Sequence, residues 1–136
     1  MEKLLEYLKV SYENILNLHH NVTGVNFFND HEQLGKYYEL IGEISDELVE
    51  FSLSIGIKEP TIEDAIDEFE VFDTTPRSSR ECFTLVRDIF NSVIGYINDI
   101  KDKQPQWLKN KLEEYQATLD LEANYKIAHK LMNGGV

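Results

Sequence analysis

The chain has 136 residues, of which 42% are apolar and 28% are charged, and this composition is typical of one globular domain. No apolar run approaches the roughly 18–20 residues of a membrane span, and residues 1–6 do not form a secretory signal, so we expect no membrane association. The net charge of −12 repels nucleic acid, and no basic patch offsets it. The lone Cys82 cannot form an internal disulfide, which favours a cytoplasmic setting.

The first half of the chain has the hydrophobic spacing of two long helices. The first is expected over about 2–21 and the second over about 27–55, with a turn around Gly24 between them and a C-terminal cap at Gly56. The stripe of the first helix is Leu4, Leu8, Tyr12, Ile15, His19 and Val22. The stripe of the second is Phe27, His31, Leu34, Tyr38, Ile41, Leu48, Phe51 and Ile55.

The second half predicts a short helix and two more long ones. Thr61 and Asp64 form a capping box before a short helix over 62–69, and Ser78 with Glu81 forms another before a helix over about 79–102. A last helix runs over about 105–132, with Pro105 in its first turn, and residues 133–135 should fray. Four long helices with one long connection predict an all-α, ferritin-like four-helix bundle, formed by a single domain over 1–136.

Two histidines stand where the helical stripes call for apolar side chains. A single histidine in such a place is usually a core residue with a hydrogen-bond partner, and His129, near the chain end, should be solvated. His19 and His31, however, are equally far from the turn, since (19 + 31)/2 = 25. In an antiparallel hairpin they should face each other at one level, which is suitable for binding a divalent metal.

The second helix also carries a pair of acids, Asp46 and Glu50, at i, i+4 spacing. Carboxylates with imidazoles suit Fe(II), Mn(II) or Zn(II). Asp46 follows His31 by 15 residues, which corresponds to roughly 22 Å along one helix. Two residues this far apart cannot be ligands of the same metal ion. The two pairs form one site only if two chains pack antiparallel, which a two-fold axis would do twice. On the residues alone, the alternative that the pairs are unrelated is preferred. The chain has no Glu-x-x-His motif for an intrachain di-iron site.

The stretch 19–32, with the sequence HHNVTGVNFFNDHE, resembles the Dps family, or mini-ferritins, which has H-W-N-x-x-G-x-x-F-x-x-x-H-E there. That family has an Asp fifteen residues after the second His and a Glu four further, which here are Asp46 and Glu50. The resemblance implies a shell of twelve subunits, with His19 and His31 of one subunit facing Asp46 and Glu50 of its neighbour. It therefore favours the two-chain site. The implied activity is ferroxidase: Fe(II) is oxidised with hydrogen peroxide or dioxygen and Fe(III) is stored, which protects against oxidative stress.

Three departures from the family pattern bear on this expectation. His20 stands where the family has Trp, and Gly35 replaces a carboxylate that can assist iron, which weakens a second iron position. A Lys-rich N-terminal tail is missing, so DNA binding is not expected. The alternative is a non-enzymatic Dps-like shell or interaction protein whose metal site is degenerate or occupied by zinc. Residues 43–73 hold 11 acids against Lys58, which would suit mineral nucleation or only a solvated face.

Overall fold

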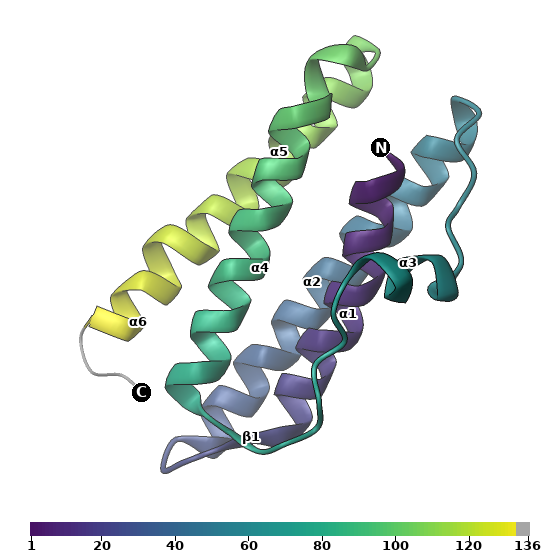
Figure 1. Ribbon diagram of the computed structural model, residues 1–136. Coiled ribbons are helices and arrows are strands. Elements are labelled where there is room, and N and C mark those ends of the chain that lie inside the picture. Colours follow the sequence, from purple (N-terminus) through teal and green to yellow (C-terminus); the bar gives the residue numbers. More distant parts are fainter. Residues whose placement is uncertain (133–136) are drawn as a thin grey trace. The chain divides into compact units, whose positions relative to one another are not determined.

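The computed structural model describes residues 1–132, which are mainly helical, with irregular connections and one short two-stranded pair (Figure 1). Residues 133–135, for which fraying was predicted, lie outside the described residues. The helices are α1 (Glu2–Asn21), α2 (Phe27–Ser54), α3 (Ile62–Glu68), α4 (Ser79–Ile100), α5 (Gln106–Leu121) and α6 (Ala128–Met132). The chain divides into two compact units, residues 1–82 and 83–136, which are taken one at a time. The single domain stays a prediction.

In the first unit, α1 and α2 form the predicted hairpin. Most apolar side chains of both stripes are buried, with Leu8 and Ile15 on α1 and Leu34 and Ile41 on α2 fully enclosed. The ends of the second stripe are not, because Phe27 is exposed and Phe51 and Ile55 are half-buried. Each such side chain contributes roughly 1.5–3 kcal/mol of burial. His19, His31 and Tyr38 lie at the edge of the stripes and are only half-buried. On α2 it is Tyr37, rather than Tyr38, that is buried in the core.

Glycines end the elements where the sequence predicted turns. Gly24 has a φ of +129° in the α1–α2 connection, and Gly56 has a φ of +84° just after α2, conformations that side chains with a Cβ rarely adopt. Beyond α2, the Ile57 amide donates to the Ser52 carbonyl at 2.9 Å and the Gly56 amide donates to the Leu53 carbonyl at 3.1 Å. This pair of bonds is a Schellman cap, and it satisfies carbonyls that the helix end would leave without donors.

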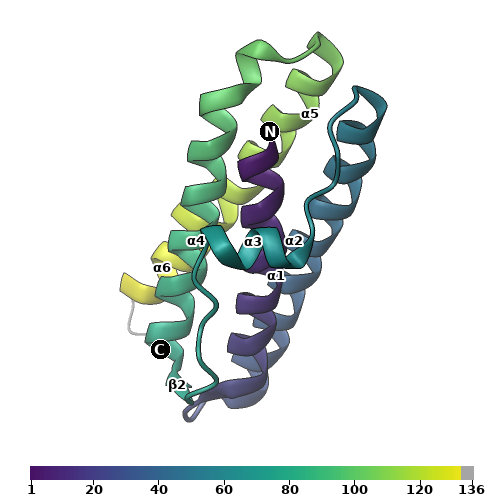
Figure 2. The same cartoon turned by 45° about the vertical axis from the view of Figure 1, so that its right-hand side comes forward.

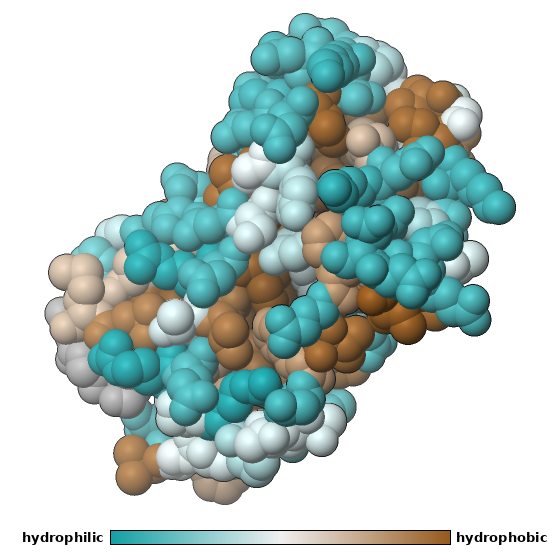
Figure 3. Space-filling model, viewed as in Figure 1, coloured by the Kyte–Doolittle hydropathy of each residue, from teal (hydrophilic) through white to brown (hydrophobic). Residues whose placement is uncertain are grey.

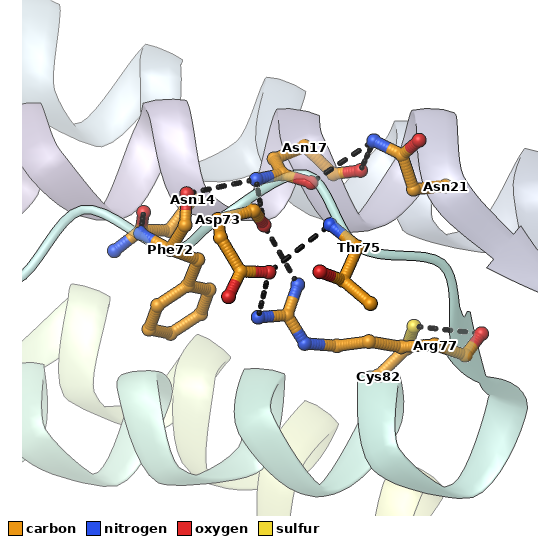
Figure 4. A network of polar contacts seen from close by, with 8 residues as sticks. All are labelled: Asn14, Asn17, Asn21, Phe72, Asp73, Thr75, Arg77 and Cys82. Atoms are coloured by element: carbon orange, nitrogen blue, oxygen red, sulfur yellow. Dashed lines mark hydrogen bonds and ion pairs between the residues drawn. The ribbon is translucent and has the colours of Figure 1, made fainter.

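The connection from α3 to α4, residues 69–78, runs along α1 and is held there by asparagine side chains (Figure 4). We call this connection the strap. Asn14 donates to the Glu70 carbonyl at 2.9 Å and accepts from the Phe72 amide at 2.8 Å, while Asn17 donates to the carbonyls of Phe72 and Asp73. These side chains supply the hydrogen bonds that an irregular segment lacks within itself.

The strap ends in a strand pair that the sequence did not predict. Strands β1 (Val22–Thr23) and β2 (Arg77–Ser78) pair in parallel, with Val22 opposite Arg77. Both segments contain turn residues and are only two residues long, so neither has a readable alternation. Their pairing comes instead from the burial of Val22 and from the Thr23 hydroxyl, which donates to the Arg77 carbonyl at 3.1 Å.

Helix α3 has the predicted capping box. The Asp64 amide donates to the Thr61 hydroxyl, and the Thr61 amide donates to the Asp64 carboxylate, both at 3.1 Å. Figure 2 shows α3 lying across α1, and edge-to-face contact between Tyr7 and Phe69, with centroids 5.0 Å apart, fastens this region to α1. The surface around α3 is mixed in Figure 3, where hydrophilic side chains lie beside a hydrophobic patch, in keeping with its exposed acids and with the exposed Ile62 and Ile66.

In the second unit, α4 and α5 run antiparallel, and polar side chains link them at several levels. Gln116 donates to the Ile94 carbonyl at 3.1 Å and to the Asn98 side chain at 2.7 Å, and Asn124 exchanges hydrogen bonds with Asn91. The cap predicted at the start of α4 is present, because the Glu81 amide donates to the Ser78 hydroxyl at 3.2 Å.

Both helices of this unit have the predicted bounds to within two residues, but each contains an irregular turn. Helix α4 ends at Ile100 in a 3-10 turn, η1 (Lys101–Lys103), and the last helix is interrupted by a π-helical segment, η2 (Glu122–Ile127). The helix predicted over about 105–132 is therefore present from Gln106 to Met132, with a π-helical segment that the sequence did not predict. Its buried positions Leu119, Ala123 and Ile127 are four residues apart, and the wider π turn keeps them on one face.

Candidate metal site

The structure brings His19 of α1 and His31 of α2 into direct contact. Their imidazole rings stack with centroids 3.9 Å apart and an interplanar angle of 13°. The equal distance from the turn therefore predicted their common level correctly. Phe27 stacks on the other face of this pair, with its centroid 5.1 Å from that of His31. Their role as metal ligands stays a prediction.

Each ring is fixed by the backbone of the opposite helix. Nδ1 of His19 lies 2.5 Å from the His31 carbonyl oxygen, and Nδ1 of His31 lies 2.7 Å from the His19 carbonyl oxygen. A carbonyl oxygen only accepts, so both Nδ1 atoms carry the proton and donate it. The lone pair of each neutral ring is then on Nε2. This is the arrangement of metal-binding histidines, whose second nitrogen is held by an outer hydrogen bond.

The electrostatics of the pair keep His19 neutral. Burial is the main cause that lowers the pKa of His19 below its usual 6.5, and the neighbouring imidazoles of His31 and His20 lower it further. The hydrogen bond to the His31 carbonyl and the charge of Glu39 oppose this shift. A neutral imidazole is the form that binds a metal, so no proton needs to be displaced at neutral pH.

Two glycines on α2 explain how α1 approaches so closely. A Cβ at Gly35 would lie 2.9 Å from Cε1 of His19, and a Cβ at Gly42 would lie 2.9 Å from Cε2 of Tyr12. The ring of His19 therefore occupies the space that a side chain at position 35 would need. A longer side chain at position 35, such as the carboxylate expected from the resemblance, would therefore require this ring to move.

The predicted carboxylates lie elsewhere on α2. Asp46 and Glu50 are both exposed, and the rise from His31 to Asp46 is roughly 22 Å. Within the described part of one chain, no group of three or more histidine, cysteine or acidic side chains is placed to hold a metal. Within one chain the histidine pair and the carboxylate pair are therefore separate, as the helical spacing predicted, and their role as parts of one metal site stays a prediction.

The α1–α2 face is hollowed into a groove of about 730 Å³. Its lining includes Tyr12, Tyr38, Gly42, Asp46 and Val49. Tyr38 contacts both neighbours, with ring centroids 5.3 Å from His19 and 5.6 Å from Tyr12. Acids dominate the charge of the groove, with Glu13, Glu39, Glu43, Asp46 and Glu59 against Lys9.

Sequence reasoning missed this groove and its tyrosines. Tyr12 and Tyr38 were assigned to the apolar stripes, where aromatic side chains are usually core. The available signal was the pair Gly35 and Gly42, seven residues apart and so on one face of α2. Small residues at that spacing indicate a close approach by the rings of a neighbouring helix.

Comparison with known proteins shows which fold the chain has. No protein-family model matches the chain, and no curated protein matches it in sequence. Among solved structures, it is similar to the crystal structure of a Dps protein from Bacillus brevis. The TM-score is 0.84 at 24% sequence identity, over 93% of this chain and 89% of that one.

The chain therefore has an all-α, ferritin-like fold, and in particular the fold of a Dps protein. This confirms the predicted fold class, with α3 as the short helix in the connection between the second and third long helices. Among residues 1–132, no helix has both the length and the apolar character needed to cross a membrane.

Proposed function

We propose that this protein is a mini-ferritin that oxidises Fe(II) at a site shared by two subunits and stores Fe(III) inside a homododecameric shell. The observation that carries the proposal is the stacked pair of His19 and His31, with both Nδ1 atoms tied to backbone and both Nε2 atoms available. A core histidine needs one satisfied nitrogen. Two facing rings held in the same tautomer are better explained as ligands.

The substrate Fe(II) would meet two kinds of ligand. Asp46 and Glu50 are hard anionic donors that favour the higher charge of Fe(III), and the imidazoles of the neighbouring subunit complete the shell. Hydrogen peroxide or dioxygen would take the remaining positions as the oxidant. Exposed acids of α3, such as Glu63 and Asp67, are candidates to nucleate the ferric mineral if they face the shell interior.

A complementation experiment tests the shared site. One variant, His19→Gln/His31→Gln, lacks imidazoles, and a second, Asp46→Asn/Glu50→Gln, lacks carboxylates. Each alone should lose peroxide-dependent Fe(III) absorbance after Fe(II) is added. Co-refolding the two in equal amounts should restore about a quarter of the wild-type rate, since half the dimers are mixed and each has one intact site of two.

The matched control is Asp88→Asn, which removes an exposed acid of α4 and should leave the rate unchanged. If the mixed protein stays inactive although it assembles, the shared site is wrong. If both double variants oxidise iron like wild type, the ligand set is wrong.

A second candidate function is a Dps-like shell that holds zinc, or nothing, at the same interface. The packing of His19 against Gly35 favours it, because this packing removes a ligand position. Metal analysis of protein purified without chelator separates the two functions. Uptake of many iron ions per subunit supports storage, whereas a single tight zinc ion or none supports the second candidate.

A further inference from the structure

Tyr38 lies between the histidine pair and a second tyrosine. Its ring is tilted by 52° against that of His19, with centroids 5.3 Å apart, and it meets Tyr12 edge-to-face at 5.6 Å. We propose that Tyr38, with Tyr12 behind it, supplies the second electron when peroxide is reduced at this site. The inference rests on the proposed function. It names the residue that supplies the second electron at a site that binds a single iron.

The need for a second electron follows from Gly35. With His19 packed on that position, two imidazoles and two carboxylates remain, which suffice for one ion at each site. Reduction of hydrogen peroxide to water takes two electrons, and one Fe(II) provides one. A second electron from outside the metal is required, or the half-reduced oxidant leaves as hydroxyl radical.

Tyr38 can supply this second electron, and the reaction then balances. One Fe(II), one tyrosine, one hydrogen peroxide and one proton give one Fe(III), one tyrosyl radical and two water molecules. The O–O bond of peroxide and the O–H bond of the phenol break, and four O–H bonds of water result. A second Fe(II) with one proton then returns the radical to tyrosine and becomes Fe(III). The sum is two Fe(II) and two protons for each peroxide, with the two irons oxidised in sequence.

The surroundings suit this role. Tyr38 is half-buried and lines the groove, where the carboxylates of Glu39, Glu43 and Asp46 can pass the phenol proton on to the water that forms. Tyr12 lines the same groove and its ring contacts Tyr38, which allows the unpaired electron to be shared between the two tyrosines. Phe27 also stacks on the pair, but a phenyl ring without a hydroxyl is much harder to oxidise.

The test is freeze-quench electron paramagnetic resonance. The assembled protein is loaded without oxygen with one Fe(II) per subunit and mixed with one equivalent of hydrogen peroxide. Wild type should give a tyrosyl signal that narrows when the tyrosine rings are deuterated. Tyr38→Phe should lose this signal, and a spin trap should detect more hydroxyl radical in that variant. The variant removes one hydroxyl and keeps the ring, so the packing is preserved.

The matched control is Tyr7→Phe. Tyr7 lies on the same helix as His19, twelve residues or about 18 Å along it, and its ring faces Phe69. This variant should keep the signal. If wild type oxidises Fe(II) without a tyrosyl signal, or if the signal persists in Tyr38→Phe, this inference is overturned while the ferroxidase stands. If wild type does not oxidise Fe(II), the proposed function falls as well.

Discussion

The hydrogen bond from His31 to the His19 carbonyl serves two purposes at once. His19 lies in the last turn of α1, where carbonyls have no partner within the helix. Nδ1 of His31 satisfies this carbonyl at 2.7 Å and in doing so fixes its own ring. A side chain that looks like a ligand is therefore also a helix cap, and its removal should affect the hairpin as well as the metal site.

Gly35→Ala should destabilise the protein by about 1–3 kcal/mol, the usual cost of overpacking. The new Cβ would lie 2.9 Å from Cε1 of His19, so the ring must move away from its stack with His31. The measurement is the urea unfolding midpoint. Gly95→Ala on α4 is the control: nothing lies within 4 Å of its Cβ, and it should stabilise by roughly 0.5–1 kcal/mol. Equal effects of the two changes would contradict the close packing at Gly35.

Cys82 should be unreactive in the folded protein. Burial raises the pKa of its thiol from 9.0 to about 11, and nearby Arg77 lowers it only in part. At pH 8 a disulfide reagent should label the native chain slowly and the urea-unfolded chain fast, because the thiolate is the nucleophile. The unfolded thiol ionises first as pH rises, so this group lowers stability between about pH 9 and 11. Equal labelling rates in the two states would contradict the burial, and Cys82→Ser gives the background.

At the scale of elements, the asparagine row of α1 is what orders the strap. Asn14 is buried and makes one hydrogen bond as donor and one as acceptor, both to strap backbone. Asn14→Ala leaves the Phe72 amide and the Glu70 carbonyl without these partners, which should cost about 1–3 kcal/mol. Hydrogen exchange should show the Phe72 amide losing protection.

Asn21→Ala is the control for this prediction. Asn21 belongs to the same helix but donates only to the backbone and side-chain oxygens of Asn17 (Figure 4). It should leave the Phe72 amide protected. Unchanged protection in Asn14→Ala would mean that other contacts hold the strap.

The elements also show how far the sequence carries the fold. Periodic spacing predicted α1 and α2 to within a residue of their observed ends, because each has a long stripe that must be buried. The strand pair and the strap were not predictable in this way. Their order comes from side chains of α1, more than fifty residues earlier in the chain, and no local pattern records such a contact.

At the scale of the whole molecule, charge determines which partners are attracted. The net charge of −12 should prevent binding to duplex DNA even at low salt, since affinity for phosphate depends on clustered Lys and Arg. A gel shift should show no complex. Appending a Lys-rich tail to the N-terminus should produce one, and a tight complex of the untailed protein would contradict the prediction.

The candidate site was predictable in part at this scale. The equal distance of His19 and His31 from the turn predicted that they face each other. The rise of the helix predicted that Asp46 of the same chain lies far from them. The groove and its tyrosines were not foreseen, because they depend on how closely α1 and α2 approach. That distance is set by the missing side chains of Gly35 and Gly42, whose effect appears only once both helices are in place.

The mutual anchoring of the two imidazoles also affects the order of events during assembly. Both rings are immobilised by their own hairpin, so they lose rotational freedom when a single subunit folds, before any neighbour arrives. If the proposed shared site forms, ion capture needs no further ordering of these two side chains, and the remaining entropic cost falls on the exposed acids of the other subunit. In a freshly folded monomer the imidazole nitrogens would thus already be in place, and association with a second subunit would add the carboxylate oxygens.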